Sequence, residues 1–62
     1  MNSQVTLTKN HIDKVCEGYF EEEKTWYAAL VMDVKEDKQE AEIAWIGMKL
    51  QTSVPKKYIN IL

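Results

Sequence analysis

The chain has 62 residues, of which 45% are hydrophobic and 29% are charged, and its formal net charge is −2. These values exclude a disordered tail and allow one small domain, which buries roughly 60% of its unfolded surface. The longest apolar run, residues 26–32, is far shorter than the roughly 20 residues that a membrane-spanning helix needs, so a membrane-spanning role is excluded.

The cysteine content and the start of the chain favour an intracellular protein. Residues 1–4 have neither the basic start nor the apolar stretch of a secretory signal. Cys16 is the single cysteine, whereas a domain this small in an oxidising compartment usually carries several disulfides. We expect a nuclear protein, with the cytoplasm as the alternative, and a domain that belongs to a larger protein.

All eight positive charges are lysines. Recognition of phosphates and base edges relies on arginine and on a basic face, so the composition argues against nucleic acid as the main ligand. Lys49, Lys56 and Lys57 are close in sequence and keep a nucleic-acid patch open. The alternative is that they are solvated charges that protect strand edges.

The acidic residues are denser than the basic ones. Glu17, Glu21, Glu22 and Glu23 fall within seven residues of sequence. Their combined field attracts cations and repels phosphate, so this segment predicts a basic partner. A solvated turn without a ligand is the other interpretation.

The chain begins with an expected flexible or lightly structured lead over residues 1–11. In residues 15–20 a period-two alternation predicts a half-buried strand with Cys16, Gly18 and Phe20 on one face.

Four charged residues, 21–24, form the predicted turn after this strand. Residues 26–34 are aromatic and aliphatic, which suits a pleated and partly buried surface, and predict the second strand. A polar connection over residues 35–39 follows.

The third element is predicted to be a strand over residues 40–46. A helix is the alternative for residues 33–46, because their Lys, Glu, Gln and Ala content favours it. However, Ala41, Ile43 and Trp45 are spaced by two residues, which is the spacing of a strand.

The last third of the chain predicts two further strands. Gly47 permits a positive backbone φ and marks the turn that precedes them. Residues 50–54 form the fourth strand, which ends at Pro55 because proline donates no ladder hydrogen bond. A short helical turn over residues 55–58 leads to the last strand, residues 59–62. Five short strands with turns between them predict an all-β domain, an antiparallel meander that curls into a small barrel.

The order of these segments resembles the Tudor domain of the survival-of-motor-neuron and splicing-factor type, a member of the Royal superfamily. The matching features are VCEGYF, the acidic hairpin EEEK, WYAALV, AEIAWIG and the closing VPKKYINIL, which together cover residues 12–62. Chromo-barrel relatives of the same superfamily fit nearly as well. The resemblance implies a five-stranded barrel similar to a Src-homology-3 domain over residues 12–62.

The resemblance also implies an aromatic cage that binds methylated arginine or lysine. Its three rings fall at Phe20, Tyr27 and Trp45, and Met48 occupies the position where the family often has a fourth ring. Leu50 falls where many members carry an asparagine that bonds the ligand. The expected rim of the cage consists of Tyr19, Glu21, Glu22, Glu23 and Leu50.

A cage of this kind acts by binding and needs no catalysis. Methyl groups replace much of the hydration of the cation, so its transfer between ring faces costs little desolvation and gains cation–π attraction. At about 0.5–2 kcal/mol per ring, three rings predict micromolar to millimolar affinity. The expected partner is a methylated basic peptide, such as a histone tail or an arginine-glycine-rich protein, in chromatin or RNA processing.

Other interpretations compete with the cage. Trp45 shares a face with Ile43, and the rings are equally compatible with a packed core. A barrel without a cage would serve as a platform for protein or nucleic-acid interaction. An enzyme is not expected, because His11 is the only histidine and Cys16 the only cysteine, which leaves no metal site and no nucleophile and base pair. No cofactor is expected either.

Overall fold

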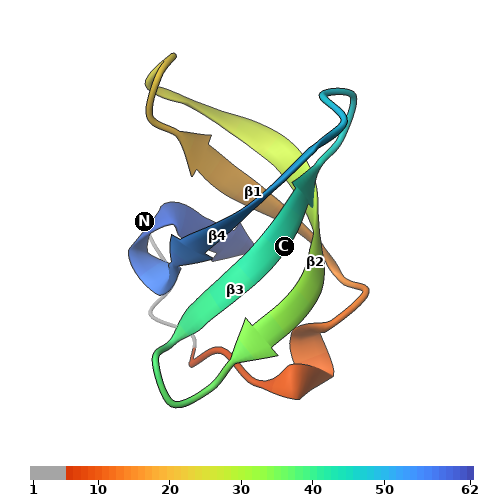
Figure 1. Cartoon of the computed structure of the whole chain (residues 1–62), viewed down its shortest axis with the longest axis vertical. Helices are drawn as coiled ribbons and strands as arrows, with labels where there is room; N and C mark the ends of the chain where they lie inside the picture. Colours follow the sequence, from red (N-terminus) through yellow and green to blue (C-terminus); the bar gives the residue numbers. More distant parts are fainter. Residues whose placement is uncertain (1–5) are drawn as a thin grey trace.

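The computed structural model describes residues 6–62, which form a small all-β domain (Figure 1). One antiparallel sheet contains five strands: β1 (Val15–Phe20), β2 (Thr25–Lys35), β3 (Glu40–Trp45), β4 (Leu50–Pro55) and β5 (Ile59–Ile61). Two 3-10 turns, η1 (Lys9–His11) and η2 (Lys56–Tyr58), are the only helical elements of the described residues. No helix in this part of the chain is long and apolar enough to cross a membrane.

The strand order across the sheet is β4-β3-β2-β1-β5. Each predicted strand is confirmed, and each predicted end lies within one residue of the observed end. The helical alternative for residues 33–46 is wrong, because β2 and β3 form a hairpin in which Lys35 pairs with Glu40. The spacing of the apolar side chains therefore outweighed the helix propensity of this segment.

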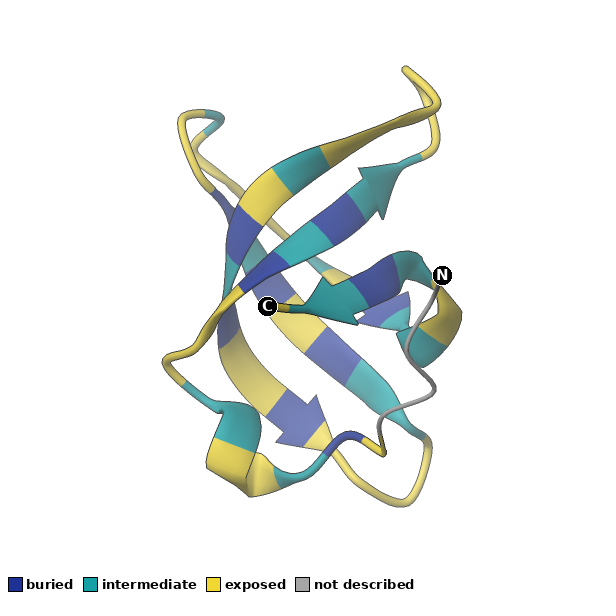
Figure 2. Cartoon of the chain, turned by 180° about the vertical axis from the view of Figure 1, so that it is seen from behind, coloured by how far each residue is buried: buried dark blue, intermediate teal, exposed yellow. Residues whose placement is uncertain are grey.

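Side chains alternate between the two faces of the strands as the sequence predicts (Figure 2). In β3, Ala41, Ile43 and Trp45 are buried on the inner face, while Glu42 is exposed. In β1, Cys16 is fully buried, and burial raises the pKa of its thiol to about 11. Cys16 is thus a neutral side chain of the core.

The long strand β2 takes part in two pairings and curves the sheet over its core. Its first half pairs with β1, from Thr25 opposite Phe20 to Leu30 opposite Val15, and its second half pairs with β3. The register shifts between Val31 and Asp33. Such an irregularity bends a strand locally.

Part of the predicted lead packs against the sheet. Leu7 is only 2% exposed, and its backbone exchanges two hydrogen bonds of 2.8 and 2.9 Å with the side-chain amide of Gln39. A capping box between Thr8 and His11 starts η1, and Lys9 donates to the carbonyl of Val34. The lead is therefore more structured from Leu7 to His11 than the polar sequence indicates. Residues 1–5 of the predicted lead lie outside the described residues.

Gly18 allows β1 to pass close over the core. A Cβ atom at this position would lie 2.6 Å from Cδ1 of Ile43 and 2.8 Å from Cη2 of Trp45. Real side chains do not tolerate contacts this short, so one of the neighbours would have to move. Glycine is therefore required here for close packing.

Replacing Gly18 with alanine is expected to lower the free energy of unfolding by about 1–3 kcal/mol, because the added methyl group overpacks this space. Ile43→Val removes the Cδ1 atom and alone costs about 0.5–1.5 kcal/mol. The double variant should lose less stability than the sum of the two single losses. Urea denaturation of the four proteins measures this coupling; an alanine variant as stable as the parent, or additive losses, would contradict the proposed packing.

Candidate functional site

Two of the three hairpin turns in the described residues, those that join β1 to β2 and β3 to β4, lie at one end of the sheet, which we call the turn end (Figure 1). Residues 21–24 connect β1 to β2, and residues 46–49 connect β3 to β4. Lys24, Gly47 and Lys49 have positive φ angles of 52°, 84° and 52°, which close these turns. The aromatic residues at the strand ends are therefore brought to the same end of the domain.

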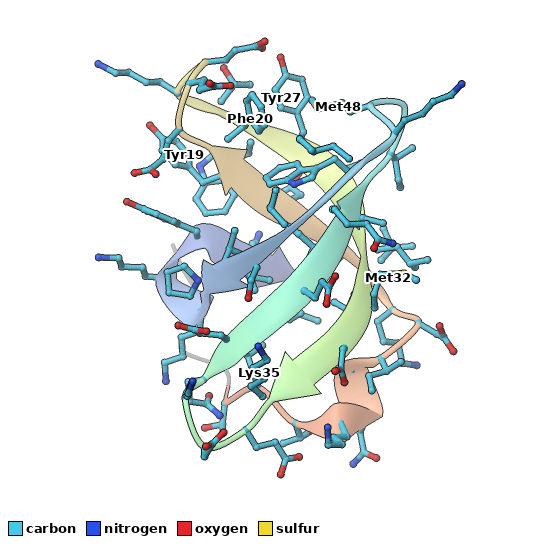
Figure 3. The ribbon with its side chains drawn as sticks, viewed as in Figure 1. Tyr19, Phe20, Tyr27, Met32, Lys35 and Met48 are labelled. Atoms are coloured by element: carbon cyan, nitrogen blue, oxygen red, sulfur yellow. The ribbon has the colours of Figure 1, made fainter. Side chains whose placement is uncertain are left out.

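The three rings of the predicted cage are in contact at the turn end. Phe20 is the central ring, with its centroid 6.1 Å from that of Tyr27 and 5.2 Å from that of Trp45. Its plane is nearly perpendicular to both neighbours, at 80° and 77°. Figure 3 shows Phe20, Tyr27 and Met48 together at this end, and all three pack against the core while remaining partly exposed.

Trp45 forms the base of this cluster. It is only 4% exposed, and its indole Nε1 donates a 2.8 Å hydrogen bond to Oγ1 of Thr52. The interpretation of Trp45 as a core residue is thus correct, although its ring also contacts Phe20. Trp45 offers a fixed floor, while Phe20 and Tyr27 are the accessible rings.

Two carboxylates of the acidic turn accept hydrogen bonds from tyrosines that lie outside the turn. The hydroxyl of Tyr27 donates to the carboxylate of Glu23, and the hydroxyl of Tyr58 donates to Oε2 of Glu21 at 2.9 Å. Each hydrogen bond stabilises the neutral phenol and raises the pKa of its tyrosine. A phenol that donates to a carboxylate is also more electron-rich, which strengthens its attraction for a cation.

A second aromatic cluster contains residues on the outer face of β1 and β2. The ring of Tyr19 lies 5.3 Å from that of Trp26 and 5.5 Å from that of Tyr58. Trp26 is 40% exposed, on the face opposite to Tyr27 as the alternation predicts. The ammonium of Lys57 lies 5.4 Å from the centroid of Tyr58, within the range of a cation–π contact.

A hollow of about 320 Å³, which we call the edge hollow, lies between β4 and the end of β1. The rings of Tyr19, Phe20 and Tyr58 line it together with Trp45. The remaining lining residues are Glu21, Glu22, Leu50, Thr52, Ser53 and Val54.

Only some of the predicted cage residues line the edge hollow. Phe20 and Trp45 line it, whereas Tyr27 and Met48 do not. Leu50, predicted at the rim of the cage, belongs to the hollow and is 38% exposed. Glu23 stays beside Tyr27, while Tyr19, Glu21 and Glu22 border the hollow.

Tyr58 was missed as a candidate by the sequence reasoning. It lies in η2, and its partner Glu21 is 37 positions earlier in the chain. The only local signal was an aromatic residue within the closing VPKKYINIL segment. Its place follows from the pairing of β5 with β1, in which Ile59 lies opposite Gly18.

The three lysines considered for a nucleic-acid patch do not form one group. Lys49 directly precedes β4 and Lys56 directly follows it. Six strand residues at about 3.3 Å each separate them by roughly 20 Å. Proximity in sequence was misleading because an extended strand carries its two ends apart.

No protein-family model matches the chain, and no curated protein is similar to it at a significant level.

The two tyrosine–glutamate pairs are expected to titrate independently. In Glu21→Gln, the neutral amide no longer favours the phenol over the phenolate, so the pKa of Tyr58 should fall toward its ordinary value while that of Tyr27 stays raised. Glu23→Gln should show the reverse pattern, and Glu22→Gln should change neither. Tyrosine Cζ signals followed by NMR between neutral and high pH report each pKa; equal responses of both tyrosines in all variants would contradict these pairings.

Proposed function

We propose that this chain is a Tudor-like five-stranded barrel that binds a methylated arginine or lysine of a basic peptide at its turn end, without catalysis. The observation that supports this function best is the position of Phe20 against both Tyr27 and Trp45. Three rings separated in sequence meet at one end of the domain, as the resemblance to the Tudor family implies. We further propose a nuclear setting in chromatin or RNA processing.

The contact between the rings indicates how a cation would bind. In an edge-to-face pair the positive edge of one ring meets the negative face of the other. A methylated ammonium or guanidinium group makes the same attraction with a ring face. We therefore propose that the cation takes the place of the ring edge that now contacts the neighbouring ring face. The Phe20 side chain must then rotate away from Tyr27 to make room.

The charge of the turn end favours the same class of ligand. The carboxylate of Glu23 bonds to the hydroxyl of Tyr27, so a negative charge lies beside an accessible ring. Met48 packs in the same region and supplies an apolar contact for methyl groups. Because Phe20 must move and one wall is not aromatic, the expected affinity stays in the micromolar to millimolar range. Useful binding then depends on several contacts with one partner.

The competing function is a protein-interaction platform without a cage. It is favoured by the ring separations of 5.2 and 6.1 Å, which are those of rings in direct contact. The separation of Lys49 from Lys56 makes a protein partner better supported than a nucleic acid in this role. The platform would bind peptides regardless of their methylation.

Titration of the isotope-labelled domain with short peptides tests the proposal. Each peptide carries one central residue, lysine or arginine, in its methylated or unmethylated form. We expect a methylated peptide to bind with a dissociation constant between about 10 µM and 1 mM and to shift the ring signals of Phe20 and Tyr27. Tyr27→Leu should weaken this binding about 2- to 30-fold, the equivalent of one cation–π contact.

Trp26→Leu is the matched control, because it removes a more exposed ring from the opposite face of the same strand. Its affinity for the single-cation peptide should equal that of the parent. Equal binding of methylated and unmethylated peptides would support the platform and overturn the proposed recognition of a methylated residue. The same conclusion follows if no peptide shifts Phe20 or Tyr27 at millimolar concentration.

A further inference from the structure

We propose that the edge hollow is a second cation subsite, which takes a lysine or arginine side chain from the same peptide that occupies the turn end. This inference rests on the proposed function, because one partner supplies both side chains. Phe20 contributes to both places, since it contacts Tyr27 at the turn end and also lines the hollow. The two subsites therefore share one ring.

The size of the hollow suits one long side chain. Its volume of about 320 Å³ corresponds to roughly ten water molecules and lies at the lower limit of small-ligand pockets. Trp45 closes its floor, and its indole is held by the hydrogen bond to Thr52. A rigid floor of this kind stays in place when a side chain enters.

The charge of the lining selects a cation. Glu21 and Glu22 are the only ionised side chains that line the hollow in the described part of the chain. An anion would be repelled there, and a purely apolar ligand would gain nothing from these carboxylates. The lining thus combines negative charge with ring faces, which is the chemistry that binds ammonium and guanidinium groups.

The rings of Tyr58 and Tyr19, which line the hollow, are suited to the same cation–π contact. Tyr58 donates its hydroxyl proton toward Glu21, which enriches its ring in electron density. The ammonium of Lys57 already lies over the Tyr58 ring, which shows that this ring accepts a cation within the domain. Tyr19 lies beside Tyr58 with an interplanar angle of 37°, so the two rings form one continuous aromatic wall.

The edge strand beside the hollow favours a peptide over a free small amine. Within residues 6–62, β4 pairs with β3 alone, so its other edge presents unpaired backbone groups. Thr52, Ser53 and Val54 of this strand line the hollow. An extended peptide can pair along such an edge and place a side chain into the adjacent pocket.

Two peptides that differ in one feature test the second subsite. Both carry the methylated residue that binds best at the turn end; one has flanking lysines two and three residues away, and the other has glutamines there. We expect the lysine peptide to bind about 3- to 30-fold more tightly to the parent domain. Its additional chemical-shift changes should fall on Tyr19 and Tyr58.

Variants on the two sides of Phe20 separate the subsites. In Tyr58→Leu the gain from the flanking lysines should disappear, while the affinity for the glutamine peptide stays at the parent value. Tyr58→Phe keeps the ring but loses the bond to Glu21, so it should retain part of the gain and show that the domain still folds. Tyr27→Leu should weaken both peptides by the same factor.

The outcomes distinguish the two proposals. If the tighter binding of the lysine peptide persists in Tyr58→Leu, or occurs without shifts at Tyr19 and Tyr58, the second subsite is overturned. The proposed recognition of a methylated residue at the turn end would then still stand. Unmethylated lysine peptides that shift Tyr19 and Tyr58 would support the hollow as a cation site. If the domain also showed no preference for methylation, the proposed recognition of a methylated residue would be overturned.

Discussion

Trp45 lies directly beneath β1 because Gly18 has no side chain, and this contact fixes where the neighbouring rings lie. The indole contacts Phe20 and is held by Thr52. Phe20, two residues after Gly18 on the same face, is thereby placed at the junction of the turn end and the edge hollow. A single tight contact in the core thus positions the surface on which the proposed recognition depends.

The acidic turn, residues 21–24, supplies the carboxylates that lie beside the rings of the proposed cation sites. Its Glu23 bonds to Tyr27 at the turn end, and its Glu21 bonds to Tyr58 beside the edge hollow. Each carboxylate therefore orients a ring and also contributes negative charge near it. This arrangement places negative charge beside two tyrosine rings in a chain whose net charge is only −2.

The strands were predictable from the sequence because their signals are local. Alternation in residues 40–46 and the charges of residues 21–24 each specify an element within a few positions. The rest depended on pairings between distant segments. Tyr58 reaches Glu21 because β5 pairs with β1, and Leu7 lies in the core with its backbone bonded to the side chain of Gln39, 32 positions away. Lys49 and Lys56 are close in sequence, but β4 separates them, so they do not form the patch that their proximity in sequence suggested. The resemblance to Tudor domains gave no indication of the edge hollow.

The proposed function requires that a methylated cation contacts the rings of the turn end. Intermolecular nuclear Overhauser effects between the methyl protons of a bound methylated peptide and the ring protons of the domain measure this contact directly. We expect effects to Phe20 and Tyr27, together with a changed separation between these two rings. Effects to Trp26 alone, or an unchanged Phe20–Tyr27 contact with no effect to either ring, would contradict the proposed function.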